Sequence, residues 1–297
     1  MHRLTANPYL LLTLTALFWS GNMVMGRGIR ADVPPIALAF WRWIIALALV
    51  APLALPHLRS QWPRLRAAWP VIVVLGLLGV GGYNTFAYLA LQHTTATSAT
   101  LLNSFIPIAT IAFAFLFFGK RLSRLETAGV VVSLGGVAAI VSRGSLEILL
   151  GFTLNTGDLW MLAAVTVWGL YTVGLQKRPE GVHPMLLLAA FTVVGLLALT
   201  PAYAWELSAG RTINLGWSAI GGILYTGIFP GFLGYVFYNA GVAAVGPARG
   251  SLFIHLMPVF ATLLAAIFLD ERPYLYHFVG IALVFAGIYL TTRRQPA

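Results

Sequence analysis

Charged residues are scarce in this sequence, and acidic residues are the scarcest. Only 9% of the 297 residues are charged, with eight Asp and Glu, whereas 59% are hydrophobic. A water-soluble core of this length cannot bury so much apolar surface, so the composition excludes a soluble globular protein and indicates a membrane protein. The 18 Lys and Arg residues lie mostly between apolar runs, where they orient helices, which argues against nucleic-acid binding.

Cysteine is absent, which excludes disulfides, thiol catalysis and thiolate metal sites. The sequence also lacks the motifs G-x-S-x-G, H-E-x-x-H and G-x-x-x-x-G-K-[ST] and a catalytic pair of carboxylates. No catalytic constellation is therefore visible. We expect no enzyme activity, no metal site and no cofactor.

Long hydrophobic runs are abundant instead. About twenty apolar residues cross the hydrocarbon core of a bilayer. Runs of that kind predict an all-α, polytopic membrane protein with ten transmembrane helices. We expect these helices near residues 8–25, 36–55, 69–91, 98–118, 125–141, 159–176, 184–204, 217–240, 247–269 and 275–292.

The basic residues predict the orientation, because Lys and Arg are retained on the cytoplasmic side of a membrane. With the amino terminus inside, twelve fall in inner loops and five in outer loops, while Arg42 lies inside the second run and counts for neither. We therefore expect both termini in the cytoplasm. No small-x-small cleavage site follows the first run, so we interpret it as a retained span and not as a signal peptide.

Landmarks repeat along the chain at an offset of 151 positions, which indicates an internal duplication. Five spans in each half make the second half enter the membrane from the opposite face. We therefore expect two inverted five-helix repeats at residues 1–143 and 158–297, joined by an extracytoplasmic loop at 144–157. The matching landmarks are Pro107 with Pro258, Lys120 and Arg121 with Glu271 and Arg272, Gly129 with Gly280, and Gly136 with Gly287.

The second copy, PARGSLFIHLMPVFATLLAAIFLDERPYLYHFVGIALVFAGIYL, resembles the carboxy-terminal repeat of the EamA family within the drug/metabolite transporter superfamily. The first-span motif ALFWSGNMVMGR is similar to the YddG-type aromatic amino acid exporters of that family. The resemblance covers essentially the whole chain and implies a ten-helix exporter of amino acids or related metabolites in the bacterial inner membrane. One departure is Asp270, which precedes Glu271 where the family usually has Gly.

All eight carboxylates fall in loops or within one turn of the end of a predicted span. Proton- or sodium-coupled carriers commonly place an acidic residue deep in the bundle, where its cost is tolerated for its function. This placement argues against a carboxylate relay. We expect transport driven by the substrate gradient or coupled through another group.

Aromatic and amide side chains occupy the middle of several predicted spans. Trp19 and Trp168 take matching places in the first spans of the two halves. An aromatic cavity with a few amides suits a zwitterion with an apolar side chain, whereas an interfacial aromatic belt is the alternative. The expected substrate-binding residues are Trp19, Asn22, Tyr83, Asn103, Trp168, Tyr171, Tyr238 and His255.

Two basic side chains near the ninth span allow two interpretations each. His255, three residues before Pro258, either donates to a carbonyl of a neighbouring helix or faces the cavity and binds substrate there. Arg249 either anchors the helix at the head groups or contacts a carboxylate or phosphate at the inner gate.

Interior prolines and paired glycines mark the remaining structural features. Pro107, Pro230 and Pro258 each remove a helix hydrogen bond, and their near-symmetric placement predicts hinges, with simple packing as the alternative. Glycines seven residues apart predict small-residue seams on the fifth and tenth spans, where helices approach closely. These glycines are Gly129 with Gly136 and Gly280 with Gly287.

The sequence thus predicts an exporter of amino acids, aromatic or otherwise apolar, and of related small metabolites. It would work by alternating access through a central, largely uncharged aromatic cavity. Its expected partners are that small-molecule substrate and the lipid bilayer; a homodimer is compatible with the sequence, although a monomer suffices. The alternatives are a multidrug or organic-cation exporter, a passive pore, and a lipid-modifying enzyme with His255 as general base and Ser104 or Ser251 as its partner.

Overall fold

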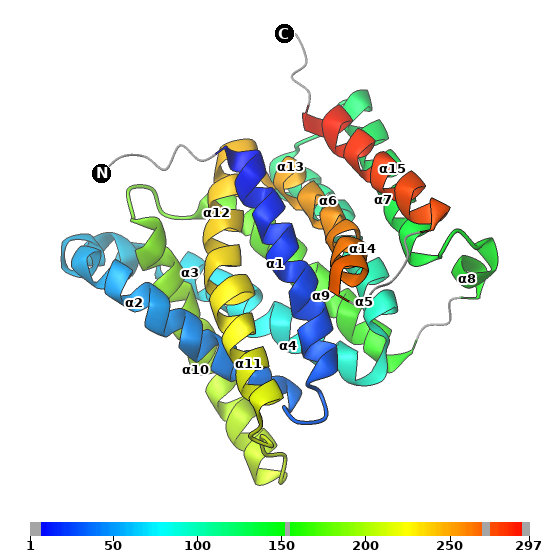
Figure 1. Cartoon of the computed structure of the whole chain (residues 1–297). Coiled ribbons are helices and arrows are strands. Elements are labelled where there is room, and N and C mark those ends of the chain that lie inside the picture. Colours follow the sequence, from blue (N-terminus) through cyan, green and yellow to red (C-terminus); the bar gives the residue numbers. More distant parts are fainter. Residues whose placement is uncertain (1–6, 152–154, 269–273, 293–297) are drawn as a thin grey trace.

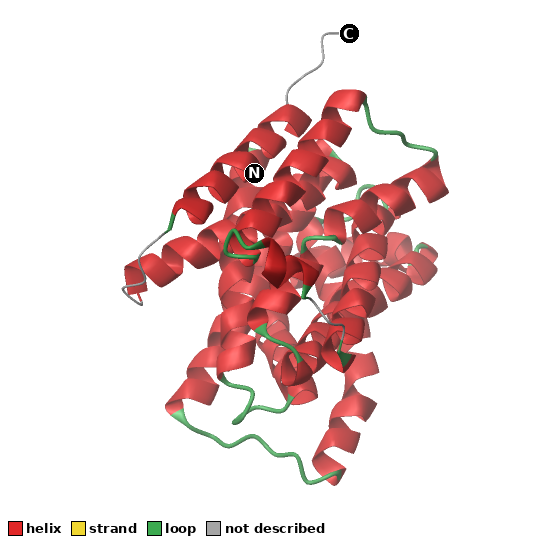
Figure 2. Cartoon of the chain, turned by 90° about the vertical axis from the view of Figure 1, so that its right-hand side faces the viewer, coloured by secondary structure: helices red, strands yellow, loops and turns green. Residues whose placement is uncertain are grey.

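Ten helical rods form one bundle in this computed structural model, which describes residues 7–151, 155–268 and 274–292 (Figure 1). Each rod is long and apolar enough to cross a membrane. Within the described ranges there is no β-strand, and Figure 2 shows helices joined by loops. The prediction of an all-α membrane protein with ten spans is confirmed.

Several rods are interrupted by a π-helical or 3-10 turn, so the ten spans contain more than ten elements. The elements are α1 (Pro8–Gly28), α2 (Pro35–Ala67), α3 (Trp69–Leu75), η1 (Gly76–Gly82), α4 (Tyr83–His93), α5 (Ala96–Asn103), α6 (Ile106–Phe118), α7 (Arg124–Val141), α8 (Leu146–Leu150), α9 (Thr156–Gly174), η2 (Leu175–Lys177), α10 (Pro184–Ser208), α11 (Trp217–Thr226), η3 (Gly227–Leu233), α12 (Gly234–Val245), α13 (Pro247–Leu252), η4 (Phe253–His255), α14 (Leu256–Phe268) and α15 (Leu275–Thr292). The predicted charged turn at residues 270–273 lies outside the described residues.

The second span is longer than predicted. It was expected to end near Leu55, but α2 continues to Ala67. In the extension, Arg64 donates to the Gly181 carbonyl at 2.9 Å and Gln61 accepts the backbone N–H of His183 at 2.7 Å. These contacts join α2 to the segment before α10, which is distant in the sequence. The local sequence pattern therefore did not predict the extra turns.

The start of α2 is capped by a different helix. Pro34 precedes α2 and provides no side-chain acceptor, so the first free amides need another partner. The buried carboxylate of Glu206, on α10, accepts from the amides of Ile36 at 3.2 Å and Ala37 at 2.6 Å. Glu126 and Asp158 cap their own helices, α7 and α9. These three carboxylates therefore serve helix ends.

Two π-helical segments occupy equivalent places in the two halves. η1 begins at Gly76 and η3 at Gly227, which are 151 positions apart like the other landmarks. Glycine-rich sequence in η1 and Pro230 in η3 weaken the regular helical ladder there. The third and eighth spans, predicted as continuous, are each interrupted at these segments.

The other two interior prolines stand immediately after helix breaks. α5 ends at Asn103 and α6 begins at Ile106, so Pro107 is the second residue of the new helix. Pro258 follows the 3-10 turn η4 and is the third residue of α14. Proline is tolerated in a first turn because its missing N–H has no partner to lose there.

Glycines bring α7 and α15 together at one edge of the bundle (Figure 1). A Cβ on Gly136 would lie 2.6 Å from the carbonyl oxygen of Gly280, and one on Gly129 would lie 2.6 Å from that of Gly287. No larger side chain fits at these distances, so the predicted glycine seam is confirmed. The crossed pairing, Gly129 with Gly287 and Gly136 with Gly280, makes the two helices antiparallel.

Candidate functional site

Aromatic rings from four spans meet inside the bundle. The indole of Trp19 on α1 lies 5.0 Å from that of Trp168 on α9, at an interplanar angle of 87°. Tyr83 on α4 lies 4.7 Å from Trp168, and Tyr238 on α12 lies 5.0 Å from Trp19. The full set, called the ring cluster below, is Trp19, Tyr83, Trp168, Tyr171, Tyr235 and Tyr238. The structure thus brings five of the predicted binding residues together in one cluster of contacting rings.

Glycines at the interrupted spans make room for the rings. A Cβ on Gly79, within η1, would lie 2.5 Å from the ring of Tyr171. A Cβ on Gly234, directly after η3, would lie 2.6 Å from the indole nitrogen of Trp19. The two π-helical segments therefore place bare backbone against the ring cluster.

The polar atoms of the ring cluster bind neighbouring helices, except Nε1 of Trp168, which has no partner among the described residues. The hydroxyl of Tyr83 donates to Asn103 Oδ1 at 2.8 Å, and Nε1 of Trp19 donates to the carbonyl of Pro230 at 3.1 Å. The hydroxyl of Tyr171 donates to Asn239 Oδ1 at 2.9 Å. No member of the cluster is more than 7% exposed, so the rings fill the space between the helices themselves.

A buried arginine lies beside the ring cluster. Arg42 on α2 is 1% exposed, and its Nη1 donates to Asn22 Oδ1 at 3.1 Å, to Asn84 Oδ1 at 2.6 Å and to the Tyr88 hydroxyl at 2.6 Å. Asn22, which the sequence placed with Trp19, therefore belongs to the surroundings of Arg42. A lone charge within an apolar run is a functional signal in a membrane protein, and it could have identified Arg42 from the sequence. The structure thus places one buried charge beside the ring cluster, where a largely uncharged cavity was predicted.

His255 joins three helices and does not face a cavity. Its Nε2 donates to the Ser104 carbonyl at 2.8 Å, and its Nδ1 contacts the Ser133 hydroxyl. Because a carbonyl can only accept, the proton sits on Nε2, and Nδ1 accepts from Ser133. The side chain is fully buried with both ring nitrogens engaged. This corrects the expectation of a cavity-facing imidazole and matches the alternative of a histidine bound to a neighbouring helix.

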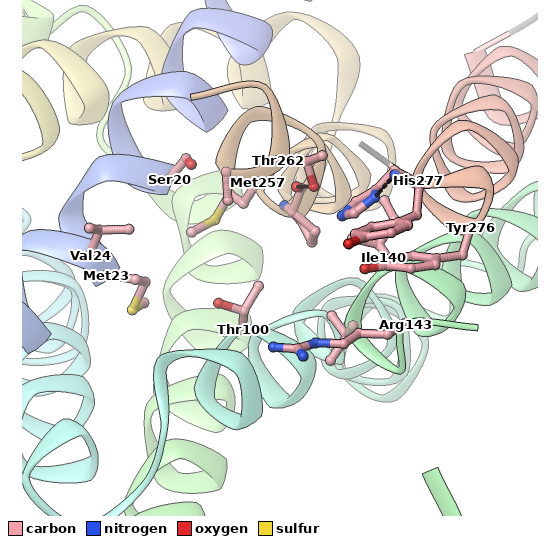
Figure 3. Close-up of a pocket in the computed structure, with 14 residues that line it drawn as sticks. Ser20, Met23, Val24, Thr100, Ile140, Arg143, Met257, Thr262, Tyr276 and His277 are labelled. Atoms are coloured by element: carbon pink, nitrogen blue, oxygen red, sulfur yellow. Dashed lines mark hydrogen bonds between the residues drawn. The ribbon is translucent and has the colours of Figure 1, made fainter. Parts of the chain in front are cut away.

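The structure also contains a cavity of about 510 Å³, which no member of the ring cluster lines. Figure 3 shows Ser20 and Met23 of α1 on one side of it and Tyr276 and His277 of α15 on the other. Among the predicted functional residues, only Pro258 lines it. Its walls come from spans one, four, five, nine and ten, whereas the rings of spans one, three, six and eight pack on one another.

One chain of contacts connects the cavity to the ring cluster. Met257, which lines the cavity, accepts from Nδ2 of Asn103 at 3.4 Å through its sulfur. Asn103 in turn accepts from Tyr83, whose ring packs on Trp168. Methionine is flexible and adapts to irregular space. Met257 and Asn103 therefore stand between the cavity and the rings.

An ion pair lies at the opposite end of the bundle from the cavity. Nη2 of Arg249, on α13, lies 3.0 Å from Oε1 of Glu126, at the start of α7. It is the sole ion pair among the residues that the structure describes. Arg249 thus contacts a carboxylate of the protein itself, which agrees with the second of the two interpretations of the sequence. In the same described part of the chain, no three His, Asp or Glu side chains could hold a metal ion.

Comparison with known proteins places this fold in a family. The family model for EamA-like transporters matches residues 7–142 and again residues 155–293. The chain belongs to the EamA-like transporter family. With its ten apolar helices, this EamA-family chain is a multi-pass membrane protein.

Its relatives are named as transporters. An uncharacterized transporter of Archaeoglobus fulgidus is 29% identical, over an alignment that covers 98% of this chain and 99% of that protein. The uncharacterized transporter YdeK of Bacillus subtilis is 30% identical, with 96% and 94% covered. A protein of Streptantibioticus cattleyicolor named "Probable terminal-alkyne amino-acid exporter" is 28% identical, with 95% and 92% covered. One solved crystal structure shares the fold, with a TM-score of 0.77 at 22% identity over 97% of this chain and 96% of that chain.

Proposed function

We propose that this EamA-family transporter exports amino acids with aromatic or other apolar side chains by alternating access. The observation that carries the proposal is the ring cluster, in which the matching tryptophans Trp19 and Trp168 meet at 5.0 Å. Ring faces and edges attract an apolar or aromatic side chain. The amide of Asn103 and the tyrosine hydroxyls offer dipoles to the ammonium and carboxylate groups.

The size of the neighbouring cavity supports a small organic substrate. Its volume of about 510 Å³ lies within the range of roughly 300–1,000 Å³ that is usual for small-molecule sites. The named amino-acid exporter among the relatives, at 28% identity, agrees in substrate class. The similarity of the first span to YddG-type proteins supports aromatic amino acids in particular.

The contacts between the two halves support an inverted pair of repeats. Asn84 touches Tyr235 and Ser104 touches His255, and each pair is 151 positions apart. Equivalent residues meet in this way where a two-fold axis passes between two copies. The crossed pairing of antiparallel α7 and α15 has the same symmetry. We infer an axis in the membrane plane, as in other transporters with inverted repeats.

The two ends of the bundle suggest how access alternates. The cavity walls come from the second half of α1, the end of α7 and the start of α15. Arg249 and Glu126 join α13 to α7 at the other end. With both termini in the cytoplasm of a bacterial cell, as the charge pattern predicts, this is an outward-facing state closed inside by the ion pair. The breaks at Pro107, Pro230 and Pro258 would act as hinges during the return.

The driving force we propose is the substrate gradient. The buried carboxylates Glu206 and Asp158 each accept a hydrogen bond from a backbone amide at a helix end, which argues against a proton relay through them. The engaged ring nitrogens of His255 also weigh against the alternative of a lipid-modifying enzyme, because a general base needs a free nitrogen.

Counterflow into proteoliposomes tests this function. The full chain should exchange labelled phenylalanine, tryptophan or leucine saturably, and Trp168→Ala should reduce exchange by about tenfold or more through lost ring contacts. Trp217→Ala is the matched control, because Trp217 is 91% exposed. Failure of every amino acid would overturn the proposal. Exchange of organic cations alone would favour the multidrug alternative, and non-saturable flux would indicate a pore.

A further inference from the structure

Arg42 carries a positive charge that no carboxylate balances within the part of the chain that the structure describes. Its three hydrogen-bond partners, Asn22, Asn84 and Tyr88, are neutral. The carboxylate of Glu206, which contacts the start of α2 from α10, is committed to the amides of Ile36 and Ala37. An arginine stays protonated in proteins, so burial cannot neutralise this group.

The hydrogen-bonding capacity of Arg42 is only partly used. A guanidinium has five N–H donors in a planar fork, and all three bonds here leave from Nη1. Its Nε is buried and has no partner among the described residues. Charged groups inside a membrane are costly and are tolerated where they bind an ion or a substrate. The unused donors and the unbalanced charge together describe a site for an anion.

Arg42 is also connected to the ring cluster through Trp43 and Asn84. Its guanidinium lies 5.3 Å from the ring centre of Trp43, and Trp43 packs on Tyr235 at 4.7 Å. Asn84, which accepts from Arg42, donates to the Tyr235 hydroxyl at 3.2 Å. Tyr235 in turn lies 5.3 Å from Trp168. A ligand bound to both places would present an anionic group to Arg42 and an apolar group to the tryptophans.

An irregular stretch of backbone lies beside Arg42. The π-helical segment η3 runs next to it, and a Cβ on Gly231 would lie 3.6 Å from Nη2 of Arg42. The equivalent segment η1 contacts the same group of residues, since the Tyr235 hydroxyl donates to the Gly79 carbonyl. π-Helical turns are short interruptions of the regular ladder and are frequent at functional sites.

We propose that Arg42 binds the carboxylate of the transported substrate, with Asn22 and Asn84 holding the guanidinium when no substrate is present. This inference rests on the proposed function and identifies the group that selects a carboxylate over its neutral analogues. A carboxylate matches the guanidinium fork with two parallel hydrogen bonds, which neutral acceptors on separate helices cannot provide.

The test compares ligands that share a phenyl ring and differ either at the carboxylate or at the ammonium group. The full chain in lipid nanodiscs is titrated with phenylalanine, phenylalaninamide and 3-phenylpropionate while its tryptophan fluorescence is recorded. The wild type should bind the two carboxylates about tenfold or more tightly than the amide, as expected for hydrogen bonds to a charged group. Arg42→Gln should lose this preference, and Arg42→Lys should keep part of it. Arg143→Gln, which alters the arginine lining the cavity, should retain it.

A second variant covers the case in which Arg42→Gln does not fold. Asn22 uses only its Oδ1 in the bonds from Arg42 and the Tyr88 hydroxyl, so Asn22→Asp preserves both and adds an internal counter-charge. It should fold at least as stably as the wild type and yet lose carboxylate binding, because the site is already occupied. A purely structural arginine would leave binding unchanged in this variant.

The outcomes separate this inference from the function on which it rests. Saturable amino acid counterflow without a carboxylate preference, or a preference that survives Arg42→Gln or vanishes in Arg143→Gln, overturns the role of Arg42 and leaves the exporter proposal standing. Absence of amino acid counterflow overturns the exporter proposal, whereas binding of 3-phenylpropionate that depends on Arg42 would still support the anion site.

Discussion

Two basic side chains, Arg42 and His255, are fully buried between the spans, and their surroundings differ. His255 is held at both ring nitrogens, by the Ser104 carbonyl and the Ser133 hydroxyl. Arg42 is held through one nitrogen only, by neutral oxygens. An imidazole can be buried neutral with its hydrogen bonds complete, whereas a guanidinium keeps its charge. The first arrangement stabilises the bundle, and the second leaves a charge available to a ligand.

The largest effect is expected from Arg42→Met, which removes the charge but keeps a long side chain. Amino acid counterflow should fall by about 100-fold, which corresponds to about 3 kcal/mol and is typical of a bond to a charged group. The free energy of unfolding should change by less than about 1 kcal/mol, because an unbalanced buried charge is lost. Tyr88 still donates to Asn22 at 2.8 Å, and Asn84 to Tyr235 at 3.2 Å. A large loss of stability with normal flux per folded molecule would show that Arg42 stabilises the bundle and does not bind the substrate.

The opposite result is expected from His255→Leu. The Ser104 carbonyl and the Ser133 hydroxyl lose their partner in a fully buried place, which should cost about 2 kcal/mol of unfolding free energy. Flux per folded molecule should stay within about twofold of the wild type, because no binding group is removed. Thermal unfolding and counterflow on one preparation measure both quantities. His93→Leu, at an exposed position, is the control. An equal loss of unfolding free energy in this variant would show that the hydrogen bonds of His255 are not the cause of the loss.

The glycine seam contains no titratable group, so it provides a reference for a purely structural effect beside Arg42 and His255. Gly136→Ala places a Cβ 2.6 Å from the Gly280 backbone, which cannot move aside as a flexible side chain does. We expect a loss of about 1.5 kcal/mol by overpacking between α7 and α15. Gly135→Ala, one position away with nothing within 4 Å of the new Cβ, should be neutral. Chemical denaturation in detergent compares them, and an equal loss in both variants would show that close packing at the seam is not responsible, because Ala favours a helix more than Gly does.

The smallest effect is expected at a histidine that lies outside the spans. His183 stacks on His57 at 3.8 Å, and its Nδ1 accepts the backbone N–H of Met185 at 3.3 Å. Burial lowers the pKa of His183 below its ordinary value, and the charge on His57 lowers it further. The unfolded chain therefore binds the proton at higher pH than the folded chain, so stability is full above about pH 7 and falls as the pH drops below about 6.5.

Partial exposure limits this pH effect to less than about 1 kcal/mol. His183→Asn keeps an acceptor at the start of α10 but does not titrate, so the fall in melting temperature between about pH 7.5 and 5.5 should be smaller in the variant. An equal fall in both proteins would assign the pH dependence to other groups.

The parts of the fold that were predictable depend on repetition and periodicity. The ten spans follow from the lengths of apolar runs, and the α7 and α15 seam follows from glycines seven residues apart, because both patterns are local to one helix. Five members of the ring cluster were identified because polar and aromatic side chains in the middle of a span are rare. Tyr235 was missed, although it stands 151 positions after Asn84 and touches it.

The contacts that were not predicted all join distant segments. Glu206 caps α2 across 169 positions, and Asn22 accepts a hydrogen bond from Arg42. His255 was correctly singled out as unusual, but its orientation could not be known, because its partners lie on two other spans. The sequence predicted a cavity among the aromatic side chains. In the structure these rings pack on one another, and the cavity is lined by other residues.

By itself, the sequence determined the membrane setting, the number of spans and the glycine seam, because each depends on hydrophobicity and spacing within single helices. Only the tertiary structure decided which buried polar groups meet, where the cavity lies, and that one arginine remains without a counter-charge in the described part of the bundle. The physical reason is that these outcomes depend on how each helix is rotated about its own axis against its neighbours, and that rotation is set by the packing of all ten spans together.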